Sequence, residues 1–135
     1  IIGRWLGGTF TNFDNIVSLT RKLESLEKGK EDGTWDRYIK KEQVTMSKQL
    51  DKLQDTVGGI KMMKKLPQAV FVVDIKKEKT AVAEANKMGI PIIALTDTNV
   101  NPELVQYAIP ANDDAVKSIE VISNLVAEAI KAVKK

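Results

Sequence analysis

The chain has 135 residues, of which 43% are hydrophobic and 29% charged, with a net charge of +3 at pH 7. This is the length and composition of one globular domain, and no apolar run approaches the roughly 20 residues of a membrane span. Cysteine and histidine are both absent, which excludes disulfides, zinc sites built on those ligands, and Ser-His-Asp or Cys-His catalysis, so we expect an intracellular protein.

The first half of the chain predicts two helices. Residues 1–11 are expected to form a turn, and the first helix then runs from Asn12, a good N-cap, to Lys28, with Gly29 just past its end. A second helix is expected from about Ile39 to Thr56. Alternating spacings of three and four predict that the two helices pack as an antiparallel hairpin. The repeat positions are Ile16, Leu19, Leu23 and Leu26, then Ile39, Gln43, Met46, Leu50, Leu53, Val57 and Ile60.

The second half alternates apolar runs with helical stretches, which is typical of a parallel sheet buried on both faces. Right-handed crossovers would place its three strands side by side. Because three strands are few for such a sheet, we expect further strands upstream, in a longer protein of which this is the carboxyl-terminal part. The expected elements are strand Ala69–Val73, helix Glu78–Met88, strand Ile92–Leu95, a turn at Asn101-Pro102, strand Gln106–Ile109, and a helix capped by Asn112 or Asp113.

The final helix carries an apolar stripe that is expected to pack on the sheet. Its members are Ala115, Ile119, Ile122, Val126 and Ile130.

Two aspartates stand at the carboxyl ends of neighbouring predicted strands. Asp74 and Asp97 could lie close together and bind a divalent cation or a phosphate-bearing ligand at this edge of the sheet. The alternative is that strand-end polar residues satisfy local backbone groups in turns, and we favour it. No G-x-G-x-x-G or G-x-x-x-x-G-K-[ST] motif follows any strand, so the sequence predicts neither a nucleotide-dependent enzyme nor a bound cofactor.

Basic residues are concentrated in the first half of the chain. Residues 1–66 hold 13 basic and 9 acidic residues, a net of +4, whereas residues 67–135 have a net of −1. Cations combined with hydrogen-bonding and aromatic side chains are what structured RNA requires. For any single lysine, a solvated helix face is the preferred alternative. The candidate set is Arg4, Arg21, Lys22, Lys40, Lys41, Lys61, Lys64 and Lys65, with Trp5, Thr11 and Asn12.

Several motifs resemble one family. Residues 4–13 are similar to the R-W-L-G-G-x-L-T-N-F segment of the small-subunit ribosomal protein S-two family, with Phe10 in place of the usual Leu or Met. Residues 58–67 are similar to its G-G-I-K-x-M-K-K-L-P motif, and residues 110–115 to its P-x-N-D-D-A motif. The family's amino-terminal segment, with two further strands, has no counterpart here.

The resemblance implies a non-enzymatic constituent of the small ribosomal subunit. It implies a Rossmann-like, flavodoxin-like α/β fold with an inserted coiled-coil hairpin, divided into a turn (1–12), the hairpin (13–57) and the parallel-sheet domain (58–135). The expected partners are small-subunit ribosomal RNA and neighbouring ribosomal proteins, including ribosomal protein S-one. The expected location is the ribosome in the cytoplasm or in an organelle. The RNA contacts that it implies are Arg4, Trp5, Thr11, Asn12, Lys61, Lys64 and Lys65, with the hairpin as a second contact element.

An interaction module that pairs through the hairpin remains a further alternative. The expected RNA-binding site consists of nine residues. These are the seven that the resemblance implies, together with Arg21 and Lys22 from the basic face of the first helix.

Overall fold

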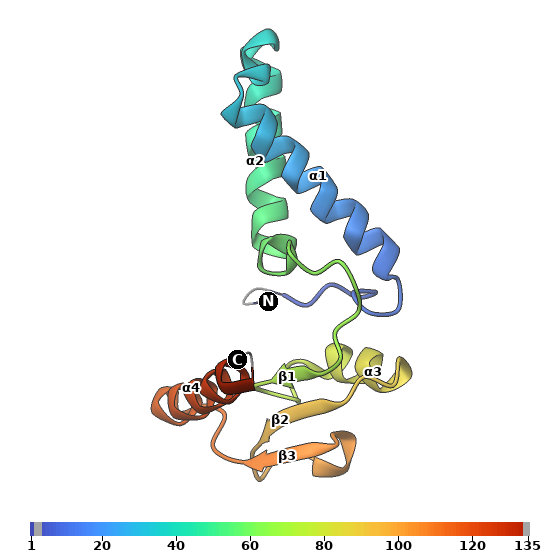
Figure 1. The fold of residues 1–135 in the computed structure, drawn as a ribbon, viewed down its shortest axis with the longest axis vertical. Coiled ribbons are helices and arrows are strands. Elements are labelled where there is room, and N and C mark those ends of the chain that lie inside the picture. Colours follow the sequence, from blue (N-terminus) through green and yellow to red (C-terminus); the bar gives the residue numbers. More distant parts are fainter. Residues whose placement is uncertain (2–3, 134–135) are drawn as a thin grey trace. The chain divides into compact units, whose positions relative to one another are not determined.

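The computed structural model describes residue 1 and residues 4–133 of the chain. These divide into two compact units, Ile1–Pro67 and Gln68–Lys135. The first unit is helical and the second contains the sheet (Figure 1).

The first unit begins with a tight turn, as expected. The Leu6 carbonyl accepts hydrogen bonds from the Thr9 amide at 3.1 Å and from the Thr9 hydroxyl at 2.6 Å. Gly8 has a φ of +91°, a left-handed conformation that an L side chain rarely adopts. The turn buries Thr9 and Phe10 and leads into α1, Phe13–Glu31. Asn12 is at the N-cap position, but its side chain forms no capping hydrogen bond, so that part of the prediction is wrong.

The predicted end of the first helix is also wrong. Gly29 lies inside α1, which continues to Glu31. A Cβ atom at Gly29 would lie 3.0 Å from the Nε1 atom of Trp35, which is buried. This glycine therefore serves close packing with the indole ring. The left-handed glycine beyond the helix is Gly33, with φ +75°.

The connection between the two helices is an ordered turn held by side-chain hydrogen bonds. It contains the 3₁₀ helix η1, Thr34–Arg37. The Asp32 carboxylate accepts from the Thr34 amide and hydroxyl. The Gln43 side-chain amide donates to two carbonyl oxygens, those of Trp35 at 3.0 Å and Tyr38 at 2.9 Å. These contacts satisfy backbone groups that the end of a helix leaves unpaired.

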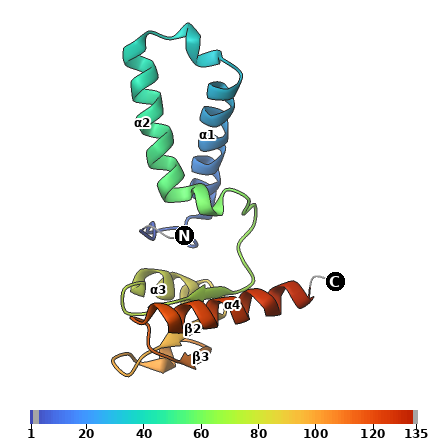
Figure 2. The same ribbon diagram turned by 90° about the vertical axis from the view of Figure 1, so that its left-hand side faces the viewer.

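The second helix, α2, spans Lys40–Val57 and lies beside α1 in both ribbon views (Figure 2). The hydrophobic contact between them centres on Ile16, Leu23 and Val57, each at most 3% exposed. Ile39 precedes the helix and is 66% exposed, so its predicted place in the seam is wrong. A 3₁₀ turn, η2, follows at Gly58–Ile60.

The second unit is an α/β unit with three parallel strands in the order β1-β2-β3. Ile93 of β2 pairs with Phe71 on one side and Tyr107 on the other. The parallel sheet and its strand order are confirmed, and no strand boundary differs from the prediction by more than one residue. The elements are β1 Val70–Val72, α3 Lys79–Lys87, β2 Ile92–Thr96, η3 Pro102–Leu104, β3 Tyr107–Pro110 and α4 Val116–Val133.

The core of the second unit lies around the central strand. Ile92, Ala94 and Leu95 of β2 are fully buried, and α3 packs on this strand through residues such as Ala81 and Ala85. Gly89, at φ +67°, ends α3 in the predicted C′ position. Asn101 accepts from the Glu103 amide at 3.0 Å and caps η3, also as predicted.

Helix α4 departs from the prediction. None of its described residues is buried, and Ile119, Ile122 and Val126 are only half-buried. Ile130, expected to pack on the sheet, is 57% exposed. The last turns of α4 extend past the strands (Figure 2), so the apolar stripe continues where the described sheet offers nothing to cover it.

No helix in residues 1 and 4–133 is both long enough and apolar enough to cross a membrane.

Candidate nucleic-acid interface

All nine predicted RNA-binding residues lie in the first unit. Four of them belong to the segment that leads into α1. Arg4, Thr11 and Asn12 are exposed, and Trp5 is half-buried. The backbone of Asn12 is held by its amide, which donates to the Gly8 carbonyl at 2.8 Å. The tight turn thus fixes the backbone from which Asn12 is presented.

The indole of Trp5 is partly committed to packing. It meets the Phe10 ring edge-on, with centroids 4.8 Å apart and planes at 76°. Phe10 is 4% exposed. Such T-shaped pairs stabilise a fold beyond the area they bury. Trp5 therefore anchors the turn and leaves only part of its surface for stacking with a base.

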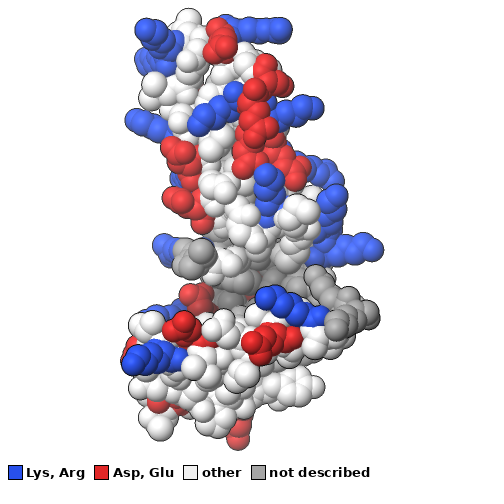
Figure 3. All heavy atoms as spheres, turned by 60° about the vertical axis from the view of Figure 1, so that its left-hand side comes forward, with Lys and Arg blue, Asp and Glu red and all other residues white. Residues whose placement is uncertain are grey.

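Two more candidates lie on α1. Arg21 and Lys22 are exposed, whereas the next residue, Leu23, is buried. On the face drawn in Figure 3, basic and acidic side chains alternate along the helices. On this face, the cations of the helical unit are therefore interspersed with carboxylates.

The three lysines after η2 have different environments. Lys61 is half-buried, and its ammonium group forms an ion pair with the Glu27 carboxylate of α1. The hydrogen bond to Glu27 raises the pKa of Lys61, and the charges of Glu27, Glu24 and Glu31 add to this effect. Lys64 and Lys65 are exposed, and neither pairs with a carboxylate in the described part of the chain.

The tertiary fold brings the two ends of this unit together. A Cβ atom at Gly59 would lie 3.6 Å from the backbone nitrogen of Ile1. The glycine pair of η2 is thus beside the segment that carries Arg4 and Trp5 in the sequence. Two motifs separated by more than 40 residues contribute to one region of the first unit.

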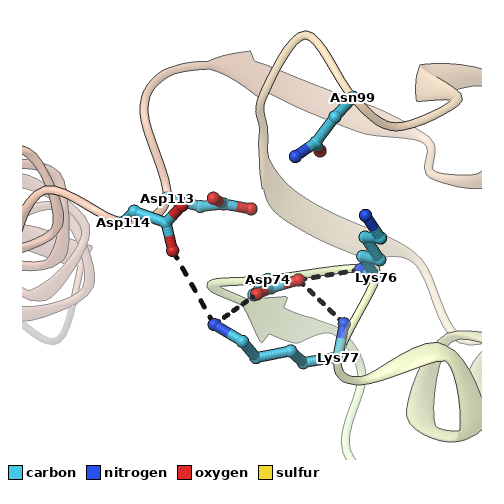
Figure 4. A pocket seen from close by; sticks show the side chains of 6 residues that line it. All are labelled: Asp74, Lys76, Lys77, Asn99, Asp113 and Asp114. Atoms are coloured by element: carbon cyan, nitrogen blue, oxygen red, sulfur yellow. Dashed lines mark hydrogen bonds and ion pairs between the residues drawn. The ribbon is translucent and has the colours of Figure 1, made fainter.

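The second unit holds a small pocket of about 230 Å³ at the carboxyl ends of the strands (Figure 4). The Asp113 carboxylate points into the space between Asn99 and Asp74. The ammonium group of Lys77 lies 3.1 Å from Asp74 and 3.8 Å from Asp114. The lining residues are Asp74, Lys76, Lys77, Asn99, Asp113 and Asp114.

The pKa values of the two least exposed carboxylates of this pocket are shifted in opposite directions. Burial alone would raise the pKa of Asp74, but hydrogen bonds from the Lys77 backbone and ammonium group hold it below its ordinary value. Burial raises the pKa of Asp113, and the negative charges of Asp74, Asp114 and Asp97 raise it further. The positive charge of Lys77 thus stabilises the ionised form of Asp74 more than that of Asp113.

The strand-end aspartates satisfy local backbone groups, which confirms the interpretation favoured from the sequence. Asp74 accepts from the amides of Lys76 and Lys77 at 2.9 and 2.8 Å. Asp97 accepts from the Thr98 amide at 2.6 Å and does not line the pocket. In residues 1 and 4–133, no three acidic side chains are arranged to hold a metal ion.

Similarity to known proteins identifies the family of this chain. The family model described as "Ribosomal protein S2" matches residues 1–132. The chain belongs to the ribosomal protein S2 family. This is the S-two family whose motifs the sequence resembles.

Two relatives in the ribosomal protein S2 family are each named "Small ribosomal subunit protein uS2". The one from Chloroherpeton thalassium is 50% identical over 127 residues, which cover 94% of this chain and 51% of the relative. The one from Salinibacter ruber is 46% identical over 131 residues, which cover 97% of this chain and 41% of the relative. The chain therefore spans about half the length of these curated relatives.

Within this family's motifs, the structure separates packing residues from exposed ones. In residues 4–13, the buried members are Thr9 and Phe10, whereas Arg4 and Thr11 are exposed. In residues 58–67, Lys61 is paired and Lys64 and Lys65 are exposed. Each of these motifs therefore combines residues committed to internal contacts with residues that are exposed.

Sequence reasoning missed Glu27 and Asp113. Glu27 is one of many charged residues on α1, and its partner Lys61 follows it by 34 positions. No short-range pattern reveals such a pair. Asp113 was considered only as a helix cap, a role that Asn112 takes by accepting from the Asp114 and Ala115 amides.

Proposed function

We propose that this chain is a structural, non-enzymatic part of a small ribosomal subunit and that its first unit binds ribosomal RNA. The observation that carries the proposal is the match of residues 1–132 to the ribosomal protein S2 family. The relatives named as small-subunit proteins support it. The ribosome in the cytoplasm is the proposed location, and an organellar ribosome is the alternative.

The proposed contact surface combines the turn before α1, one face of α1 and the segment after η2. Exposed cations on these elements suit phosphate groups, and Thr11 and Asn12 suit phosphate or ribose hydroxyls. The net charge of +4 in residues 1–66 is consistent with a polyanionic partner. The surface consists of Arg4, Trp5, Thr11, Asn12, Arg21, Lys22, Lys64 and Lys65, and Lys61, which is paired with Glu27, belongs to the same segment as the last two.

We further propose the finer architecture that the family resemblance implies. The second unit would be part of a Rossmann-like, flavodoxin-like domain, and α1 and α2 would pack as a coiled-coil hairpin inserted into it. The corresponding division is residues 1–12, 13–57 and 58–135. Neighbouring ribosomal proteins, including ribosomal protein S-one, are the proposed protein partners.

The test is the salt dependence of binding between the full chain and small-subunit ribosomal RNA transcribed from the same organism. Binding should weaken steeply between about 50 and 200 mM salt because phosphate contacts release counterions. The double substitution Lys64→Glu and Lys65→Glu should weaken binding and lower the logarithmic salt slope by about two, one for each lost contact.

The matched control carries the same charge change in the second unit, as Lys87→Glu and Lys117→Glu. Both lysines are exposed, so the variant tests whether net charge alone explains the loss. Equal weakening by the two double variants would refute the proposed surface. Salt-independent or undetectable binding by the unmodified chain would refute the RNA-binding function itself.

A further inference from the structure

The basic link, defined as residues 61–65, follows the short 3₁₀ turn η2. Gly58 and Gly59 precede it, and glycine restricts the backbone less than any other residue. Its described backbone hydrogen bonds are short-range, from the Lys61 amide to Gly58 at 3.3 Å and from the Met63 amide to Ile60 at 2.9 Å. The backbone alone therefore does little to fix the link on the rest of the unit.

An ion pair between side chains connects the link to a distant element. The Lys61 ammonium group donates to the Glu27 carboxylate on α1. The Lys61 side chain is 33% exposed and that of Glu27 is 25% exposed, so water screens the pair only in part. Because α1 is a regular helix, Glu27 is a fixed point on which the link can be held.

The surroundings of Lys61 disfavour a contact with phosphate. Glu24 and Glu31 add negative charge beside the pair, so a phosphate that approached Lys61 would meet like charges and would have to displace Glu27. Lys64 and Lys65, by contrast, are exposed and unpaired within the described residues. The three lysines of one motif therefore differ in what they can do.

We propose that Glu27 and Lys61 form a latch that holds the basic link on α1, so that Lys61 positions Lys64 and Lys65 for RNA instead of binding RNA itself. This inference rests on the proposed RNA-binding function. Glu27 becomes a positioning residue for that function although it is acidic. Because Arg21 and Lys22 lie on the same helix as Glu27, the latch also holds the link on the element that carries these two cations.

The decisive variant is Glu27→Gln in the full chain, because the two roles of Lys61 predict opposite signs. If Lys61 bound phosphate, removal of its competitor would free it and RNA binding would tighten. A latch predicts that binding weakens about two- to fivefold, the range expected for a partly exposed ion pair, although the protein becomes more positive. The probe is small-subunit ribosomal RNA from the same organism, at fixed salt.

The control is Glu24→Gln, which makes the same charge change beside the pair without breaking it. It should bind RNA as tightly as the unmodified chain or slightly more tightly. Circular dichroism at the assay temperature checks that each variant keeps its helix content. Tighter binding by Glu27→Gln, equal to or above that of Glu24→Gln, would overturn the latch.

A charge swap provides the rescue. Lys61→Glu alone should weaken RNA binding, and the double variant Glu27→Lys with Lys61→Glu should restore it to within about twofold, because an ion pair of reversed polarity can still hold the link. If the swap stayed as defective as Lys61→Glu, the lysine itself would be required at that position and the latch would be overturned.

A measurement without RNA separates this inference from the proposed function. Amide hydrogen exchange in residues 58–65 should accelerate in Glu27→Gln, remain unchanged in Glu24→Gln and return to the original rate in the charge swap. If the unmodified chain bound no RNA, the proposed function would fail while this result still decided the latch. Unchanged exchange in Glu27→Gln would overturn the latch whatever the RNA result.

Discussion

The ionisation of individual side chains in this protein depends on both local and distant neighbours. Asp74 and Asp113 line the same pocket, yet the pKa of Asp74 is lowered and that of Asp113 is raised. The difference is Lys77, whose backbone amide and ammonium group both reach Asp74. Asp113 forms no hydrogen bond within the described part of the chain, so burial and like charges dominate its ionisation.

Asp74→Ala should destabilise the fold by about 1 kcal/mol at neutral pH, because the amides of Lys76 and Lys77 lose their acceptor. The pKa of Asp74 is lowered in the folded state. Its contribution is therefore present above the ordinary aspartate pKa and is lost as pH falls through the folded value. Urea unfolding at pH 7 and at acid pH measures this, and a deficit that grew on acidification would contradict it.

Asp113→Asn should have the opposite effect and stabilise the fold at neutral pH by about 0.5 kcal/mol, the range of a modest local substitution. The folded pKa is raised, so the ionised form is the disfavoured one. The gain should shrink as pH falls through the folded pKa, because the native carboxyl is then protonated. Asp114→Asn is the control, since Asp114 is exposed and lies near Lys77. Loss of stability in Asp113→Asn at pH 7 would contradict the assignment.

At the scale of elements, the turn between α1 and α2 is specified by packing and hydrogen bonding together. Trp35 is buried and fills the space that Gly29 leaves open, and the Gln43 amide closes the turn by binding two carbonyl oxygens. Tyr38 and Ile39 between them are extended and largely exposed. The order of this turn therefore depends on a few residues from both flanking helices.

Gln43→Ala should cost about 1–2 kcal/mol, because it leaves the Trp35 and Tyr38 carbonyl oxygens without this donor. Thermal unfolding followed by circular dichroism gives the loss of stability, and tryptophan fluorescence should report increased exposure of the indole. The control is Gln54→Ala, a substitution on the same helix at a side chain with no hydrogen bond among the described residues. Equal losses for the two variants would show that helix composition, not the closed turn, determines the effect.

For the whole molecule, charge and apolar surface are divided between the two units. The first unit has the basic excess and all nine residues that the sequence predicts to bind RNA. The second unit has the sheet and also exposed apolar side chains on α4, where Val121, Leu125 and Ile130 are 57–59% exposed. Exposed apolar surface of this kind favours association.

Leu125→Glu should leave the stability of the fold within about 0.5 kcal/mol, because Leu125 is 59% exposed, and should reduce self-association and binding of a hydrophobic dye. Sedimentation velocity over a range of concentrations and dye fluorescence measure these effects. The matched variant is Ile122→Glu on the same helix, which places a charge at a half-buried position and should cost more. Unfolding of the second unit by Leu125→Glu would contradict the exposed position of Leu125 on α4.

The sequence by itself determined the family, the class of fold and the order of the elements, because each depends on short-range patterns. Apolar runs separated by helical repeats predicted the three parallel strands, Gly89 and Asn101 marked ends of elements, and the motifs of residues 4–13 and 58–67 identified the relatives. These features need only a few consecutive residues, so they can be recognised without knowledge of the tertiary structure.

Only the tertiary structure decided what depends on residues far apart in the chain. Gly29 was predicted to end a helix and instead accommodates Trp35. Lys61 is paired with Glu27, 34 residues away, a partner that no local pattern indicates. Ile130 was predicted to be covered and is exposed. Periodicity tells which face of a helix is apolar, but the neighbour that each side chain meets is fixed by how the elements pack.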